Sequence, residues 1–233
     1  MQKRGFSQES LKLIACLTML VDHIGALLMP QYMWMRAIGR LSFPIYCFML
    51  AEGVHYTKNP LKYGLRLFVC MIISEIAFDH ALFGMISWDY QNVMVALLIG
   101  FLLGMCMKQV NQPLFQLLLV VPFALIAEWA RVDYGGLGVA LMAMFMLTRD
   151  VPYARMVQTV ALMAICYLLD ETVIVIAGFA MRLQLLAVFA MVPIALYSGR
   201  KVTNSKALQW AFYLFYPVHL MIIYFILVKM GYA

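Results

Sequence analysis

Charged residues are scarce in this sequence. Only 12% of the 233 residues are Asp, Glu, Lys or Arg, and 65% are hydrophobic, whereas soluble domains carry about 25% charged residues. The apolar residues lie in long blocks, and a helix needs roughly 20 of them to cross a bilayer. The sequence has no polar linker and leaves little room for a soluble part. It therefore predicts a single integral membrane domain over residues 1–233.

Cysteine motifs are also missing. The five cysteines are scattered through apolar segments without a CxxC spacing, which argues against a disulfide framework and against a zinc site. No small-residue cleavage site follows the basic N-terminus, so the first apolar block is predicted to be a retained helix rather than a signal peptide. The net charge of +6 is better explained by membrane topology than by nucleic-acid binding. Neither a metal nor a nucleic-acid partner is predicted.

Apolar blocks bounded by charges and turn residues predict about nine transmembrane helices. The blocks lie at about 11–29, 39–56, 64–81, 91–107, 113–130, 136–148, 154–169, 172–197 and 208–229. The block at 136–148 is short. The block at 172–197 is long and contains Arg182, so it is compatible with one helix or with a broken one.

The distribution of charge supports this number of helices. With a cytoplasmic N-terminus, most of the 17 lysines and arginines, Lys3 and Arg4 among them, fall in inner segments, as the positive-inside rule requires. Several acids, including Asp170 and Glu171, fall at outer ends. The predicted fold is therefore an all-α polytopic bundle with its N-terminus in the cytoplasm.

Several ionisable side chains interrupt the predicted spans. An ionisable residue at membrane depth costs about 2.5–3.5 kcal/mol on insertion scales. Such residues therefore tend to face a cavity or a partner, and a polar cavity within the bundle is predicted. They are Asp22 and His23 in the first span, Glu52 in the second, Glu75 in the third and His219 in the last.

Lys12 and His23 share one face of the first predicted helix. Eleven steps of 100° bring them to nearly the same angle, about 16 Å apart along the axis, and Cys16 and Met19 complete the stripe. Asp22 cannot orient His23, because neighbouring residues point about 100° apart. Any orienting carboxylate must then come from another helix. His23 is compatible with a structural interhelical hydrogen bond as well as with catalysis.

Three blocks of the sequence resemble the TraX family: LKLIACLTMLVDHIGALLMP, RAIGRLSFPIYCFMLAEGVHYTKNPLKYGLRL and FYLFYPVHL. Members of that family are membrane proteins associated with conjugation and linked to N-terminal acetylation of pilin. The same blocks are similar, more distantly, to the membrane acyltransferase-3 family. The first helix of that family carries a basic residue, ten residues and then a histidine, as Lys12 and His23 do. That family also carries a pair of arginines on its third helix. The corresponding residues here are Lys62 and Arg66, which are spaced differently, and one of which is a lysine.

The resemblance implies acetyl transfer across a bacterial inner membrane. The donor would be cytoplasmic acetyl-CoA, and the acceptor at the outer face a pilin N-terminus or another envelope substrate such as a glycan. The candidate catalytic residues are His23, Asp22, His219 and Glu52. The cations at predicted inner ends that suit the phosphates of CoA are Lys12, Lys58, Lys62 and Arg66.

Two arginines near the outer face have two interpretations. Arg36 and Arg40 lie one helical turn apart, and they suit an anionic acceptor or the negative charge that develops during transfer. An ion pair with Asp79 or Asp89 is an equal alternative.

Two other classes of function remain open. The buried acids and histidines would also suit a proton-coupled small-molecule transporter, although the sequence shows no internal repeat of the kind that many transporters carry. A noncatalytic assembly factor is the third class, and the short predicted loops count against it. In a transferase, His23 would act as a general base or would carry the acetyl group itself.

Overall fold

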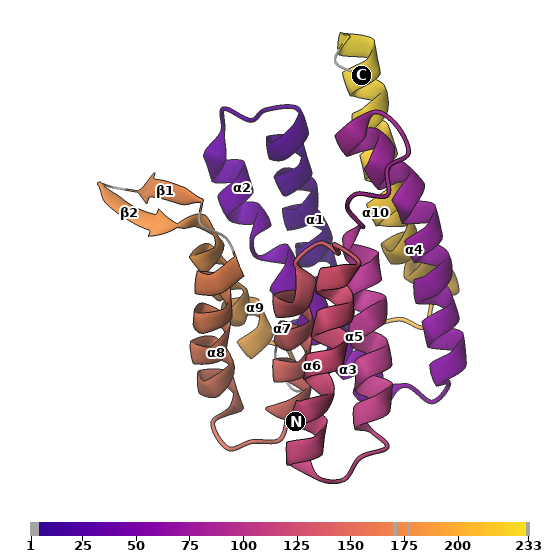
Figure 1. Cartoon of the computed structure of the whole chain (residues 1–233), viewed down its shortest axis with the longest axis vertical. Helices are drawn as coiled ribbons and strands as arrows, with labels where there is room; N and C mark the ends of the chain where they lie inside the picture. The colour runs from indigo at the N-terminus through magenta and orange to yellow at the C-terminus, as the bar shows by residue number, and fades with distance from the viewer. Residues whose placement is uncertain (1–4, 170–171, 177, 232–233) are drawn as a thin grey trace. The chain divides into compact units, whose positions relative to one another are not determined.

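The computed structural model describes residues 5–169, 172–176 and 178–231 (Figure 1). Lys3, Arg4, Asp170 and Glu171 lie outside the described residues. Most of the described chain is helical. The helices are α1 (Gln8–Leu27), α2 (Met33–Gly39), α3 (Ser42–Tyr56), α4 (Pro60–Phe83), α5 (Val93–Met107), α6 (Pro113–Trp129), α7 (Gly135–Leu147), α8 (Ala154–Leu169), α9 (Met191–Ala195) and α10 (Lys206–Met230).

Polar side chains set where several helices begin. Ser7 accepts a hydrogen bond from the backbone N–H of Ser10 at the start of α1. Asn59, Asn92 and Ser205 make the same kind of bond at the starts of α4, α5 and α10. Such caps satisfy backbone donors that the first helical turn leaves unpaired.

The apolar block at 172–197 is not one helix. Strands β1 (Val173–Ile176) and β2 (Phe179–Arg182) form an antiparallel hairpin, with Val173 opposite Arg182. A 3-10 helix, η1 (Leu183–Ala190), then leads into α9. The all-α prediction therefore holds for most of the described chain but not for this segment.

Three helical stretches in the described part of the chain are long and apolar enough to cross a membrane. They are Gln8–Leu27, Met33–Tyr56 and Lys206–Met230. Five shorter apolar helical stretches, from Val93–Met107 to Leu183–Ala195, accompany them. These stretches indicate a membrane protein, and the number of about nine crossings stays a prediction.

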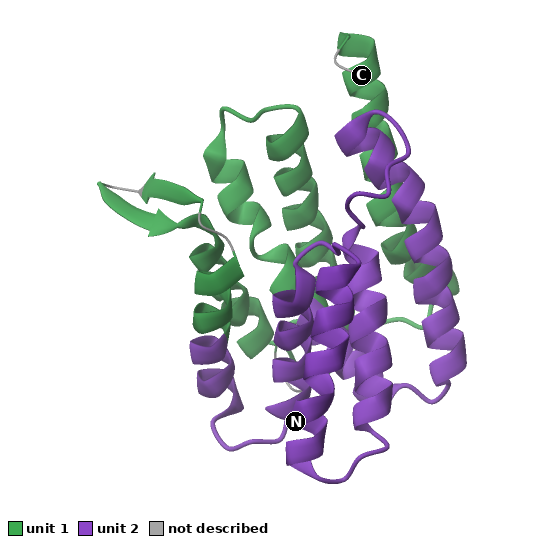
Figure 2. Cartoon of the chain, viewed as in Figure 1, with its two compact units in different colours: residues 1–46, 162–233 green, residues 47–161 purple. Residues whose placement is uncertain are grey.

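The described chain divides into two compact units (Figure 2). Unit 1 comprises residues 1–46 and 162–233, and unit 2 comprises residues 47–161. Helices α3 and α8 each contribute to both units. The prediction of a single domain over 1–233 stays a prediction.

Helix α1 lies at the centre of unit 1, where it packs against α2 and α10. Helix α2 also packs against η1. The start of the chain is joined to the segment before α10, because Phe6 pairs with Tyr197. In addition, the Glu9 carboxylate accepts hydrogen bonds from the backbone N–H groups of Val202 and Thr203, at 3.0 and 3.3 Å. Unit 1 thus ties the first and last helices of the chain together.

Helix α5 lies at the centre of unit 2 and packs against α4, α6 and α7. Glycines permit this close packing: Gly100 faces Met142 of α7, and Gly104 faces Val54 and Met146. Small residues are typical of helix contacts in membranes for this reason. Most of α7 is buried, which explains how so short an apolar block forms a stable helix.

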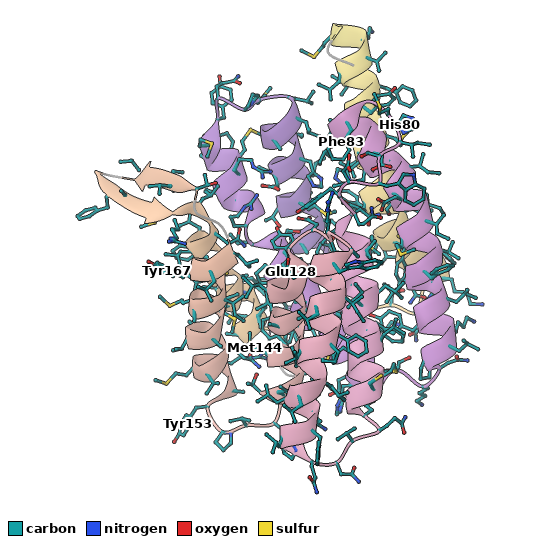
Figure 3. All side chains as sticks on the ribbon, viewed as in Figure 1. His80, Phe83, Glu128, Met144, Tyr153 and Tyr167 are labelled. Carbon is teal, nitrogen blue, oxygen red and sulfur yellow. The ribbon has the colours of Figure 1, made fainter. Side chains whose placement is uncertain are left out.

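Apolar side chains cover much of the outer surface of both units (Figure 3). In α4, α6, α8 and α10, large aliphatic and aromatic residues such as Leu65, Leu125, Val160 and Phe225 are each about 60% exposed. Soluble proteins rarely expose contiguous apolar surface on this scale. These faces therefore suit contact with lipid.

Candidate active site

The predicted stripe on α1 faces the interior of unit 1. The Lys12 Nζ lies 5.6 Å from the centre of the Phe212 ring on α10, a cation–π distance. The Cys16 Sγ lies 3.1 Å from the hydroxyl of Tyr46 on α3. Met19 is buried. The stripe is therefore lined by other helices along its whole length.

The face of α1 next to this stripe has a different character. Leu13 and Leu17 are 52% and 50% exposed, and they lie about 100° from the stripe residues that precede them. The first helix thus presents leucines outward and its polar stripe inward. His23 lies towards the C-terminal end of that inward face.

His23 contacts a second histidine, on the last helix. Its Nδ1 lies 2.6 Å from the Nε2 of His219. The two rings are nearly parallel, at 11°, with centroids 4.9 Å apart. The Nδ1 of His219 in turn lies 2.6 Å from the carbonyl oxygen of Phe215, and the ring of Tyr216 lies 5.9 Å from that of His23. The partner of His23 thus comes from another helix, and it is an imidazole.

Asp22 faces α2 instead. Its carboxylate forms ion pairs with Arg36 at 2.7 Å and with Arg40 at 3.0 Å. Arg40 also donates a hydrogen bond to the Gln184 side-chain oxygen on η1, at 3.0 Å, and Arg40 and Gln184 are both buried. Within unit 1 both arginines thus pair with Asp22. The alternative ion pair with Asp79 or Asp89, which belong to unit 2, stays a prediction.

Two glycines allow α1 and α2 to approach closely enough for these ion pairs. A Cβ atom at Gly39 would overlap the side chain of Asp22, and one at Gly25 would overlap Met35. The adjacent acid and imidazole on α1 therefore serve two different interfaces. Asp22 belongs to the contact with α2, and His23 belongs to the contact with α10.

Glu52 belongs to unit 2, where its partner is Arg149 at 3.0 Å. The same guanidinium donates to the Tyr56 hydroxyl at 2.9 Å and to Asp150 at 3.1 Å. Burial lowers the pKa of Arg149, but its hydrogen bond to Glu52 and the Glu52 charge outweigh burial and raise that pKa above its ordinary value. This cluster ties α3 to the segment after α7.

The predicted cofactor residues are divided between the two units. Lys12 belongs to unit 1, while Lys58, Lys62 and Arg66 lie at and near the start of α4 in unit 2. Lys58 and Lys62 are exposed. The Arg66 guanidinium lies over the Tyr63 ring, 5.7 Å from its centre. Their role in binding acetyl-CoA stays a prediction.

The structure thus brings some of the predicted site residues together. Within unit 1 it groups Asp22 with Arg36 and Arg40, and His23 with His219. The described residues contain no group of three or more His, Cys, Asp or Glu placed to hold a metal ion.

Four residues around these groups were not predicted from the sequence. Tyr216 and the Phe215 carbonyl accompany His219 in the YPVH segment, and the position of the motif could have suggested them. Gln184 is the polar residue that follows Arg182 in an apolar block. Arg149 lies on the predicted inner side, where charge complementarity with Glu52 could have indicated it.

Comparison with known proteins identifies the family. The family model described as TraX protein matches residues 7–227. The chain belongs to the TraX family. The resemblance found in the sequence is therefore confirmed, and the match includes both histidines of the pair and all the other predicted site residues.

Two relatives support this membership. This TraX-family chain is 28% identical, over 232 residues, to a probable fimbrial assembly protein FimC, serogroup H1, of Dichelobacter nodosus; the match covers 92% of the chain and 93% of the relative. It is 27% identical, over 159 residues, to an uncharacterized protein of Rickettsia prowazekii (strain Madrid E), covering 60% of the chain and 55% of that relative. No solved structure matches the chain.

Proposed function

We propose that this protein is an integral membrane acetyltransferase of the bacterial inner membrane. It would move an acetyl group from cytoplasmic acetyl-CoA to an acceptor at the outer face. The observation that carries the proposal is the orientation of α1, whose stripe from Lys12 to His23 faces Phe212, Tyr46 and His219 rather than lipid. A long thioester substrate needs such a lined path to meet an imidazole deep in the membrane.

The reaction needs one proton to move. The lone pair of the acceptor amine or hydroxyl forms the new bond to the acetyl carbon, the C–S bond breaks, and CoA leaves as its thiol after receiving the acceptor's proton. His23 would take that proton as a general base. Alternatively, it would first accept the acetyl group itself and pass it on.

The cations would hold the donor at the inner side. Acetyl-CoA is polyanionic, and Lys58 and Lys62 are exposed at the start of α4. Lys58 directly precedes the helix-capping Asn59, and Lys62 lies three residues after it. Lysine and arginine suit phosphate groups. Lys12 would lie at the inner mouth of the stripe, and Arg66 would complete the set.

Two ion-paired groups favour transfer over proton-coupled transport. Asp22 contacts two guanidinium groups and Glu52 contacts one. Each carboxylate thus holds neighbouring segments together, whereas a proton relay needs carboxylates that line a path through the bundle. The observation therefore supports structural roles for Asp22 and Glu52 in place of the catalytic roles first assigned to them.

The name of the Dichelobacter relative suggests the acceptor. A fimbrial subunit exported across the inner membrane would present its N-terminal amine at the outer face, and that amine would suit acetyl transfer. A noncatalytic role in fimbrial assembly remains the second candidate, because the relative is named only for assembly. A stoichiometric fimbrial partner that copurifies without any acetylation would favour this second role.

A labelling experiment tests the proposal. Purified protein in lipid is incubated with acetyl-labelled acetyl-CoA, and the label is followed into protein, water or an added peptide amine. We expect transfer by the native chain and by His80→Ala, a control histidine at the end of α4. His23→Ala should abolish transfer while it still inserts and folds. Full activity of His23→Ala would reject the assignment.

A further inference from the structure

The hydrogen bonds around His219 determine where its proton lies. A carbonyl oxygen carries no proton, so the contact of 2.6 Å between the Phe215 oxygen and His219 Nδ1 requires a proton on that Nδ1. A neutral His219 then has an unprotonated Nε2. That nitrogen lies 2.6 Å from Nδ1 of His23 and can only accept a hydrogen bond.

The surroundings favour the neutral form of both rings. His219 is 5% exposed, and no carboxylate contacts either ring among the residues that the structure describes. Asp22 is engaged by Arg36 and Arg40 on the other side of α1. A charged imidazole at this position would be buried without a counter-ion, which is unfavourable.

We infer that His219 is a positioning residue that fixes the tautomer of His23. His23 donates its Nδ1 proton to His219 Nε2, and its own Nε2 is left with a free lone pair. This inference rests on the proposed function and assigns the reacting atom within it. Nε2 of His23 is the nitrogen that takes the acceptor's proton or the acetyl group, and His219 touches neither substrate.

The arrangement also stabilises the product of proton transfer. When Nε2 of His23 takes the acceptor's proton, the ring becomes an imidazolium whose Nδ1–H still points at a neutral acceptor. His219 in turn is held by the carbonyl dipole of Phe215 on the same helix. A chain of oriented dipoles therefore replaces the carboxylate that supports histidine in many hydrolases.

The first experiment reads the tautomer directly. The chain has only four histidines, so a full-length sample in lipid with ¹⁵N-labelled imidazoles gives a simple solid-state NMR spectrum. Each signal is assigned to one histidine by its loss in a variant in which only that histidine is replaced. We expect a protonated Nδ1 and an unprotonated Nε2 for His23, with scalar coupling across the hydrogen bond to His219. A protonated Nε2 on His23, or two protonated nitrogens on His219, would overturn the inference.

The second experiment separates positioning from packing. His219→Gln places an amide oxygen near the position of Nε2 and keeps an acceptor for His23, whereas His219→Leu fills similar space with no acceptor. We expect His219→Leu to lower kcat by roughly 10–100-fold, as loss of a ring-orienting partner does elsewhere, with KM for acetyl-CoA unchanged. His219→Gln should restore part of kcat and the Nδ1–H signal of His23.

The results distinguish failure of the proposed function from failure of the positioning role. If native protein transfers no acetyl group but His23 shows the Nδ1–H tautomer, the proposed function is wrong and the tautomer assignment stands. If acetyl transfer occurs but His219→Leu and His219→Gln are equally active, the positioning role is wrong and the enzyme assignment stands.

Discussion

At the scale of single residues, Gly39 marks a point of close packing in unit 1. The side chain of Asp22 occupies the space that a Cβ at this position would need, and Asp22 is the shared partner of Arg36 and Arg40. An added methyl group must therefore push α1 and α2 apart or displace the carboxylate. Either change weakens two ion pairs that are largely shielded from solvent.

Replacing Gly39 with alanine should accordingly destabilise the protein. We expect the free energy of unfolding to fall by about 1–3 kcal/mol, the usual cost of overpacking, in thermal unfolding of the detergent-solubilised chain. Ile38→Ala is the matched control, because its side chain is 39% exposed on the same helix and it should change stability much less. Equal melting temperatures for native protein and Gly39→Ala would contradict the close approach of α1 and α2.

The residue scale also shows what the sequence could and could not predict about the site. Helical periodicity alone placed Lys12 and His23 on one face, and the structure places that face inward. Periodicity says nothing about which helix comes next to that face. The pairing of His23 with His219 joins residues 196 positions apart, so only tertiary structure could establish it.

At the scale of elements, most helix boundaries were closely predicted because they depend on local signals, but α2 (Met33–Gly39) precedes the block expected at 39–56 and was missed. The block expected at 154–169 is α8, and the short block at 136–148 is α7 within one residue. The segment at 172–197 was ambiguous because hydrophobicity alone does not distinguish a strand from a helix. Its β-branched run from Val173 to Ile176 favours a strand, and Gly178, with φ of 84°, adopts a left-handed turn conformation.

The ion pair between Glu52 and Arg149 joins α3 to the segment after α7. Glu52 and Arg149 have side chains only 12% and 22% exposed, so loss of either partner leaves the other charge poorly compensated. We expect Glu52→Gln and Arg149→Gln each to lower the free energy of unfolding by about 1–3 kcal/mol. The double variant should be less destabilised than the sum of the two.

Chemical or thermal unfolding of the four proteins in the double-mutant cycle measures this coupling. Asp150→Asn is the control, because its side chain is 81% exposed although it contacts the same guanidinium, and exposed pairs contribute little. Strict additivity of the two single changes would show that the pair does not couple α3 to the segment after α7.

At the scale of the whole molecule, the predicted topology places particular segments on opposite sides of the membrane, and this can be tested. If each predicted block before residue 169 crosses the bilayer, the hairpin β1–β2 lies outside and the end of α5 lies inside. The chain provides a natural probe for the inner side, because Cys106 is exposed whereas the other four cysteines are buried. Val175, at 67% exposed, offers a position for an introduced probe in the hairpin.

Thiol labelling of spheroplasts with a membrane-impermeant reagent checks this topology. We expect labelling of Val175→Cys in intact spheroplasts, because the hairpin faces the outside. Cys106 should react only after the membrane is opened, and Cys106→Ala removes that background signal. Labelling of Cys106 in intact spheroplasts, or of Val175→Cys only after lysis, would refute the predicted orientation.

The pairing of the first helix with the last one has a consequence for biogenesis. The ribosome makes α1 before α10, so the imidazole that contacts His23 is synthesised 196 residues later. Until α10 is made, His23 lacks that neighbour. Under the proposed function, a product that a premature stop codon releases before α10 would therefore lack the residue that positions the His23 ring.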